Sequence, residues 1–161
     1  MKKTVMSLMG AVGLSSMMLL SPTPSQAINL ELALVIDGSG SISSTDFNLQ
    51  KTAYVNAINA VLPTNGSVAV GVWQFSSGVS SVFTTTVISS LADRALLTGT
   101  ISAMSQLGGN TAIGSGISAA ATALLNNLIA SDRQVIDVST DGFNKVGTDP
   151  DTVGWRLGLN R

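Results

Sequence analysis

Three short stretches of the sequence carry oxygen-bearing side chains that could hold a metal ion. These side chains are Asp37, Ser39, Ser41, Thr111 and Asp141. Carboxylate and hydroxyl oxygens are the ligands that hard divalent cations such as Mg²⁺ prefer. The chain contains no His and no Cys, which removes Ser-His-Asp and Cys-His catalysis, most zinc chemistry and any disulfide framework. The residue types therefore favour an oxygen-only metal site over a nucleophilic centre.

Each stretch also has a simpler interpretation when it is taken alone. Glycine and serine after a strand commonly form only a turn, as in Asp37-Gly-Ser-Gly-Ser. Thr111 is suited to cap the helix that follows it, and Asp141-Gly142 is a turn signal. The apolar run over residues 32–36, directly before Asp37, is typical of a buried parallel strand. Ligands bind at the carboxyl ends of such strands, so the three stretches together predict one oxygen-rich site.

The expected elements follow the order of an α/β domain. Strands are expected over residues 29–36, 67–75, 79–88 and 133–139. A first helix is expected to begin in the cap-rich segment 43–46 and to end at the turn 63–66, and two more helices are expected over residues 91–104 and 113–129. The Thr-rich strand 79–88 has the mixed polarity of an antiparallel edge, whereas the strands 29–36 and 67–75 are apolar enough for burial on both faces. The predicted fold class is α/β: a three-layer, Rossmann-like open sheet, mostly parallel with one antiparallel edge strand, and helices on both faces.

The first helix shows the clearest amphipathic pattern. Its apolar residues recur at helical spacing and are expected to face the sheet; they are Phe47, Tyr54, Val55, Ile58, Val61 and Leu62. Asp46 lies in the first turn, where a negative charge interacts favourably with the helix dipole.

The start of the chain has the pattern of an export signal. Lys2 and Lys3 precede an apolar stretch over residues 5–20, and Ser25-Gln-Ala27 is a small-x-small cleavage pattern. We expect a signal peptide over residues 1–27, a domain over residues 28–161, and export to the periplasm, the cell surface or the medium. An uncleaved anchor is the alternative.

The expected mature chain also excludes two classes of partner. Without the two leader lysines, the chain carries a formal charge of −3 and no basic patch, which argues against nucleic acid. No later segment is apolar for long enough to span a bilayer, so we expect no stable membrane span after cleavage.

These motifs resemble the von Willebrand factor type A domain, the fold also found in integrin inserted domains. Members of that family carry a metal-ion-dependent adhesion site (MIDAS) built from a D-x-S-x-S motif, a Thr on a later loop and an Asp after the fourth strand. The resemblance implies that Ser39 and Ser41 bind Mg²⁺ directly, with Mn²⁺ or Ca²⁺ as alternatives. It implies that Thr111 binds the ion directly or through water. Asp37 and Asp141 would hold waters and hydroxyls in place.

The resemblance covers roughly residues 29–144 and implies a binding or adhesion function rather than an enzyme. Neutral hydroxyls compensate little of a cation's charge, so the metal would stay electrophilic and accept a carboxylate from a protein partner. Two alternatives stay open. One is a nonfunctional or purely structural fragment. The other is a metal-assisted hydrolase, which would lack any His, Cys or well-placed Lys for proton transfer.

The end of the chain departs from the family. A type A domain normally continues past the Asp141 loop with further helices and strands, whereas only 20 residues follow Asp141 here. We therefore expect a domain that is incomplete at the C-terminus, with one unpaired edge on the strand 133–139. Residues 152–159 alternate weakly like a strand. Unless residues 153–159 cover that edge, low stability and self-association are expected.

Overall fold

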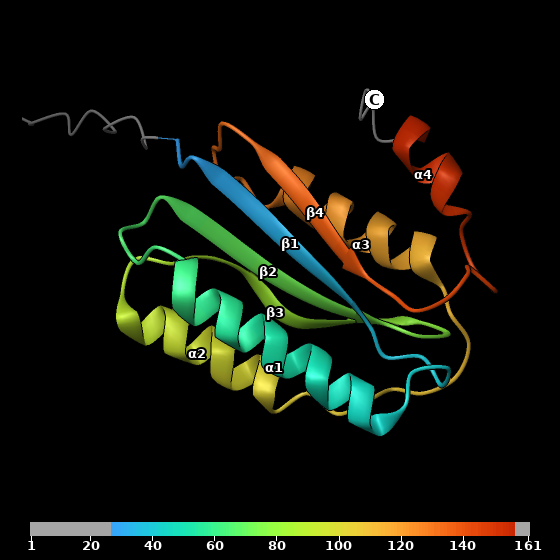
Figure 1. The fold of residues 1–161 in the computed structure, drawn as a ribbon. Coiled ribbons are helices and arrows are strands. Elements are labelled where there is room, and N and C mark those ends of the chain that lie inside the picture. The colour runs from blue at the N-terminus through green and yellow to red at the C-terminus, as the bar shows by residue number, and fades with distance from the viewer. Residues whose placement is uncertain (1–26, 157–161) are drawn as a thin grey trace, which may run out of the picture.

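A four-stranded sheet in the order β3-β2-β1-β4 organises the computed structural model, which describes residues 27–156. The strands are β1 (Leu30–Asp37), β2 (Val68–Phe75), β3 (Val79–Val87) and β4 (Gln134–Ser139). β1 runs parallel to both β2 and β4, and β3 pairs antiparallel with β2 (Figure 1). The predicted mostly parallel sheet with one antiparallel edge is therefore confirmed.

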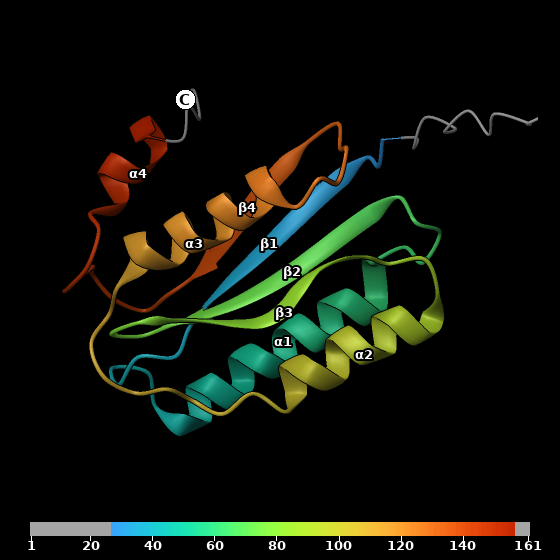
Figure 2. The same ribbon diagram turned by 180° about the vertical axis from the view of Figure 1, so that it is seen from behind.

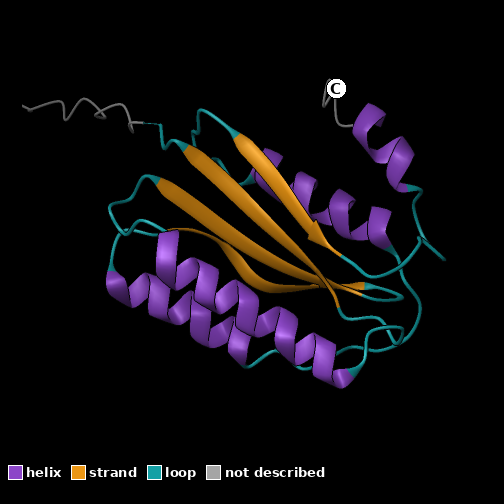
Figure 3. Ribbon diagram, viewed as in Figure 1, coloured by secondary structure: helices purple, strands orange, loops and turns teal. Residues whose placement is uncertain are grey.

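Helices cover both faces of this sheet. They are α1 (Ser44–Val61), α2 (Leu91–Ser102), α3 (Ile113–Asn126) and α4 (Pro150–Arg156). α1 and α2 lie side by side on one face, and α3 lies on the other face with α4 beside it (Figures 1 and 2). The three layers, helix, sheet and helix, are separated clearly in Figure 3.

The side chains of β1 alternate between the two helical layers. Leu34 and Ile36 belong to the core shared with α1 and α2, whereas Ala33 and Val35 belong to the core shared with α3. α3 approaches the sheet closely because Gly116 has no side chain: a Cβ there would lie 2.9 Å from Val35 Cγ1. β1 is thus held firmly from both faces, and its carboxyl end is a rigid base for the loop that follows.

The helix α1 faces the sheet largely as its sequence pattern predicts. Phe47, Ile58 and Leu62 are buried, and Tyr54 and Val55 are half-buried. Val61 was expected on this face, but the prediction is wrong because the residue is 79% exposed. It borders an open groove of about 350 Å³ between α1 and the strands β1 and β4, where the described part of the chain places no helix.

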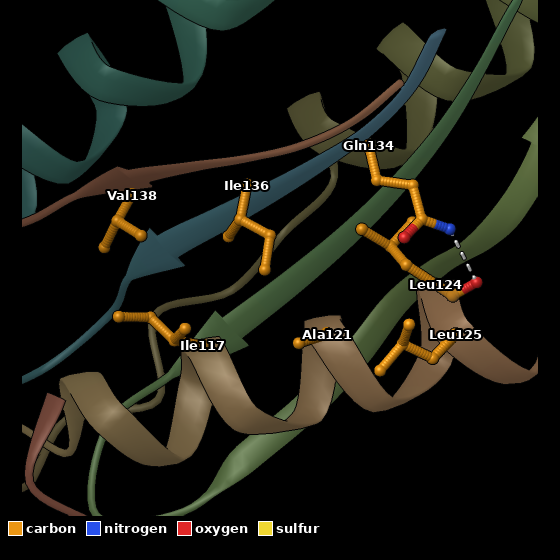
Figure 4. Close-up of a pocket in the computed structure, with 7 residues that line it drawn as sticks. All are labelled: Ile117, Ala121, Leu124, Leu125, Gln134, Ile136 and Val138. Atoms are coloured by element: carbon orange, nitrogen blue, oxygen red, sulfur yellow. Dashed lines mark hydrogen bonds between the residues drawn. The ribbon is translucent and has the colours of Figure 1, made fainter. Parts of the chain in front are cut away.

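β4 is the second edge strand of the described sheet, since its ladder is to β1 alone. On the α3 face, a mostly apolar groove of about 280 Å³ runs along it (Figure 4). The labelled side chains in that view are Ile117, Ala121, Leu124, Leu125, Gln134, Ile136 and Val138. Gln134 Nε2 crosses one end of the groove and donates to the Leu124 carbonyl oxygen at 3.1 Å.

The expectation of a strand over residues 152–159 is wrong for the residues that the structure describes. Residues 150–156 form α4 because Pro150 suits the first position of a helix and Asp149 caps it: Asp149 Oδ1 accepts from the Asp151 N–H at 2.9 Å. α4 lies beside α3 and does not pair with β4. The expected self-association through the edge of β4 stays a prediction.

Two expectations fall partly or wholly outside the described residues. The expected signal peptide lies outside them except for Ala27, as do residues 157–159 of the strand-like segment. Within residues 27–156, none of the helices is both long and apolar enough to cross a membrane.

Tyr54 links α1 to the edge strand and makes stability depend on pH. Its hydroxyl donates to Asp137 Oδ2 at 2.7 Å. Burial, with a smaller contribution from the adjacent Asp137 carboxylate, raises the pKa of the Tyr54 phenol. The unfolded chain ionises this group near pH ~10 while the folded chain keeps the proton, so stability should fall as pH rises above that value.

The variant Tyr54→Phe tests this link. We expect it to lose about 0.5–1.5 kcal/mol of stability at neutral pH, because the hydrogen bond is gone. As the pH rises above ~10, the free energy of unfolding of the variant should fall less than that of the parent chain. Urea unfolding at several pH values measures both effects, and parallel pH profiles for the two proteins would contradict the prediction.

Candidate metal centre

The five residues predicted to form a site lie together at the carboxyl ends of β1 and β4. Asp37 is the last residue of β1, and Ser39 and Ser41 follow it in the loop to α1. Thr111 lies on the connection from α2 to α3, and Asp141 lies just after β4. Because β1 and β4 run parallel, their following loops emerge at the same edge of the sheet (Figure 1).

Four of these side chains form a continuous row of hydrogen-bonded oxygen atoms. Thr111 Oγ1 donates to Ser39 Oγ at 3.2 Å, and Ser39 Oγ lies 3.0 Å from Ser41 Oγ. Ser41 Oγ in turn donates to Asp141 Oδ1 at 3.1 Å. Three loops that are distant in the sequence therefore bring their oxygens to one place.

The Asp37 side chain supports this row of oxygens from the buried side of the site. Its side chain is fully buried, and Oδ1 accepts from the Ser39 backbone N–H at 2.8 Å. Oδ2 accepts from the Thr140 hydroxyl at 2.6 Å. One carboxylate thus fixes both the loop after β1 and the loop after β4. The sequence analysis missed Thr140, and its only local signal is its position directly before Asp141.

Backbone contacts bring the α2–α3 connection against the loop after β1. The Gly108 N–H donates to the Gly38 carbonyl oxygen at 2.8 Å, and the Gly40 N–H donates to the Gly109 carbonyl oxygen at 2.8 Å. Gly108 and Gly109 have φ values of 71° and 85°, a region that glycine adopts without strain. The two glycines before Thr111 therefore allow the close approach that the site needs.

Gln106 is a second residue that the sequence analysis did not identify. Its side-chain Nε2 donates to the carbonyl oxygens of Ser39 at 2.9 Å and Ile42 at 2.8 Å. Gln106 therefore holds the loop that carries Ser39 and Ser41 through main-chain atoms of that loop. Because the side chain touches only main-chain atoms of a distant segment, no local sequence pattern marks it.

Thr111 does not cap α3, so that simpler interpretation is wrong. The N-cap residue is Ala112, which makes no side-chain cap, and the Thr111 hydroxyl points to Ser39 instead. The segment after β4 supplies the missing acceptor: Asn144 Oδ1 accepts from the Gly114 N–H at 3.4 Å. The Lys145 N–H also donates to the Thr111 carbonyl oxygen at 2.7 Å. The segment after β4 is thus fastened to the start of α3.

The site opens to solvent on one side. Asp37, Ser39 and Thr111 are buried, whereas Ser41 and Asp141 are exposed. A groove of about 310 Å³ begins beside Asp141 and runs toward α1. An external group can therefore approach the oxygen row from the side of Ser41 and Asp141.

The donor set fits a hard divalent cation. The polar side-chain atoms of the five residues are all oxygens, from two carboxylates and three neutral hydroxyls. Within residues 27–156 no group of three or more His, Cys, Asp or Glu is placed to hold a metal ion. Cation binding here would therefore depend on the hydroxyls, which suits Mg²⁺, Mn²⁺ or Ca²⁺ better than a metal that prefers nitrogen or sulfur.

Solved structures of other proteins share this fold. Proximal thread matrix protein 1 from the mussel byssus is 19% identical, with a TM-score of 0.68 over 82% of this chain. A further structure of that protein, with a zinc-occupied MIDAS motif, is 20% identical, with a TM-score of 0.67 over 82% of this chain. The von Willebrand factor domain of the type V pilus tip protein Mfa5 from Porphyromonas gingivalis is 17% identical, with a TM-score of 0.59 over 74% of this chain.

This chain spans only part of those proteins: 35% and 36% of the two mussel structures and 40% of the Mfa5 domain structure. The likeness establishes the fold of a von Willebrand factor type A domain. No curated protein matches the sequence. Over residues 27–156 the sequence does match a family, and the chain belongs to the family described as "Protein of unknown function (DUF1194)".

Proposed function

We propose that this chain is an exported binding module that captures an acidic group of a protein partner through a divalent cation. The row of oxygens from Thr111 through Ser39 and Ser41 is the observation that carries this proposal. The fold likeness to a mussel thread protein with a zinc-occupied MIDAS motif supports it. So does the likeness to proteins described as a pilus tip protein and a pilus adhesin.

Mg²⁺ is the cation that we propose for the site. Ser39 and Ser41 would bind it directly, and Thr111 would bind it directly or through water. Asp37 and Asp141 would orient the hydroxyls and bound waters. When present, the ion would supply a positive centre with an open position for a carboxylate.

The protein's own residues prepare that centre in two ways. The buried Asp37 fixes the Ser39 backbone and the Thr140 hydroxyl, so little rearrangement is needed when the ion enters. The exposed side at Ser41 and Asp141 leaves room for a partner's side chain. Neither feature supplies a group for proton transfer, so we propose a binding module and not an enzyme.

Export is part of the same proposal. We propose that residues 1–27 are removed and that residues 28–161 form the mature chain, at the cell surface, in the periplasm or in the medium. Support comes from the leader pattern and from the pilus and thread proteins that share the fold.

Titration of Mg²⁺ into the purified chain by calorimetry tests the central claim. We expect saturable binding of one ion per chain, which is reversed by a chelator. At a Mg²⁺ concentration about 100 times the Kd, the free energy of unfolding should rise by about 2.7 kcal/mol. An unchanged thermal midpoint together with no heat of binding would contradict the proposal.

A further inference from the structure

A groove of about 310 Å³ leads away from the open side of the oxygen row. Asp141 and Thr140 line its near end, and Asp141 is the residue whose Oδ1 accepts from Ser41 in the row. The groove then passes between the end of β4 and the first two turns of α1. A molecule that reaches the oxygen row from its open side therefore has a second place to bind directly beside the row.

The α1 side of this groove carries a negative charge that the oxygen row does not use. Asp46 and Gln50 line it, one turn apart on the same face of the helix. Asp46 is exposed, and its Oδ2 accepts only from the neutral hydroxyl of Ser43, at 2.7 Å. None of the described residues that line the groove is a lysine or an arginine. The positive end of the helix dipole is equivalent to about half a charge, so the carboxylate dominates and the groove is negative.

The β4 side of the groove holds a buried polar atom without a partner. Ser139 lines the groove, and its Oγ makes no hydrogen bond within the part of the chain that the structure describes. The nearest phenol, Tyr54, donates to Asp137 instead. A buried hydroxyl without a partner costs free energy, which a donor from a bound molecule would recover. The groove therefore offers oxygen acceptors from both of its sides to a ligand that carries several N–H donors.

We propose that this groove binds a basic side chain, arginine above all, that adjoins the acidic residue of the protein partner. This inference rests on the proposed function for the acidic residue itself. A guanidinium group carries five N–H donors in a planar arrangement that matches a carboxylate, so it would bind Asp46 and reach Ser139 Oγ as a further acceptor. Asp37 and Asp141 together offset the charge of a bound divalent ion, which leaves the Asp46 carboxylate to attract the guanidinium.

Three synthetic peptides test the inference on the full chain, expressed from its complete coding sequence, with saturating Mg²⁺. They are acetylated and amidated Gly-Arg-Glu-Arg-Gly, Gly-Gln-Glu-Gln-Gly and Gly-Arg-Gln-Arg-Gly. We expect the first to bind about tenfold more tightly than the second, because only arginine makes charge-assisted hydrogen bonds to Asp46; tenfold corresponds to about 1.4 kcal/mol. The third, which lacks the carboxylate, should not bind measurably.

The variant Asp46→Asn should remove most of this preference and leave Mg²⁺ affinity unchanged. Asp93→Asn is the matched control, because each aspartate lies in the first turn of its helix and donates its N–H to the capping serine, Ser43 in α1 and Ser90 in α2. Asp93 does not line the groove, so its variant should keep the preference. Ser139→Ala should lower the preference by about threefold without a loss of stability, because it removes an acceptor that has no partner in the folded chain.

The outcomes separate the inference from the proposed function. Equal, metal-dependent binding of the two glutamate peptides overturns the inference and leaves the proposed function intact. An unchanged preference in Asp46→Asn does the same, and so does an equal fall in Asp46→Asn and Asp93→Asn, which would reflect only the net negative charge of the chain.

Two other results reach the proposed function itself. Failure of both glutamate peptides to bind in a metal-dependent way overturns it. If Gly-Arg-Gln-Arg-Gly binds as tightly as Gly-Arg-Glu-Arg-Gly, the carboxylate takes no part in recognition, and both the inference and the proposed function fail.

Discussion

Replacing Asp37 with alanine is expected to lower Mg²⁺ affinity by about 100-fold. The carboxylate is fully buried and fixes both the Ser39 backbone and the Thr140 hydroxyl. Without it, the serine loop and the loop after β4 lose their common support. The Ser39 N–H and the Thr140 hydroxyl lose their acceptor, which should also cost about 1–3 kcal/mol of stability.

Two further variants keep a loss of metal binding distinct from a loss of fold. Ser41→Ala changes an exposed side chain that contacts only Ser39 and Asp141 in the site, so Mg²⁺ affinity should fall while stability stays the same. Asp132→Ala removes one negative charge from the exposed loop before β4 and should bind Mg²⁺ like the parent chain. Calorimetric titration compares all four proteins. Identical titrations for the parent chain and Asp37→Ala would refute the assigned role of the carboxylate.

Gly114→Ala is expected to cause the largest disturbance outside the oxygen row itself. A Cβ at this position would lie 2.0 Å from the Thr148 carbonyl oxygen and 2.8 Å from the Pro150 nitrogen. Because both atoms are backbone, the segment before α4 must move away from α3. We expect a loss of about 1–3 kcal/mol, as for an overpacked core, measured by urea unfolding.

The same variant should also weaken Mg²⁺ binding. The displaced segment carries Lys145, whose N–H holds the Thr111 carbonyl oxygen. Gly99→Ala is the matched control: it lies in α2, where a Cβ meets open space. That change should stabilise the chain by about 0.5–1 kcal/mol and leave Mg²⁺ affinity unaltered. If Gly114→Ala matches Gly99→Ala in both measurements, the segment after β4 does not support the site.

Much of the fold follows from patterns that are local in the sequence. The apolar run before Asp37 and the apolar stretch over residues 67–75 belong to strands that are buried on both faces, as such continuous runs predict. Asp46 was expected in the first turn of α1, and Ser43 caps that turn by accepting from the Asp46 N–H, because capping is decided within one turn. The order of the first seven elements was therefore predictable from the sequence alone.

The errors concern interactions between distant segments. Thr111 has the local features of a helix cap, and its partner Ser39 lies 72 positions away. Thr140 looks like an ordinary loop residue until Asp37, 103 positions away, is brought beside it. Val61 has the correct helical spacing, but it borders the open groove between α1 and β4, where no helix of residues 27–156 covers that face of the strand. The packing of distant segments, and not the local sequence, determines the surroundings of these three side chains.

The place of β4 in the sheet has a consequence for regulation. This strand leads directly into Thr140 and Asp141, yet its outer edge has no partner strand within residues 27–156. Where a molecule docked along that edge and an ion at the oxygen row favour the same position of these two residues, their binding is coupled. Thermodynamic linkage then requires each to strengthen the binding of the other by the same factor. A molecule bound along the β4 edge would then raise the affinity of the distant oxygen site for its ion.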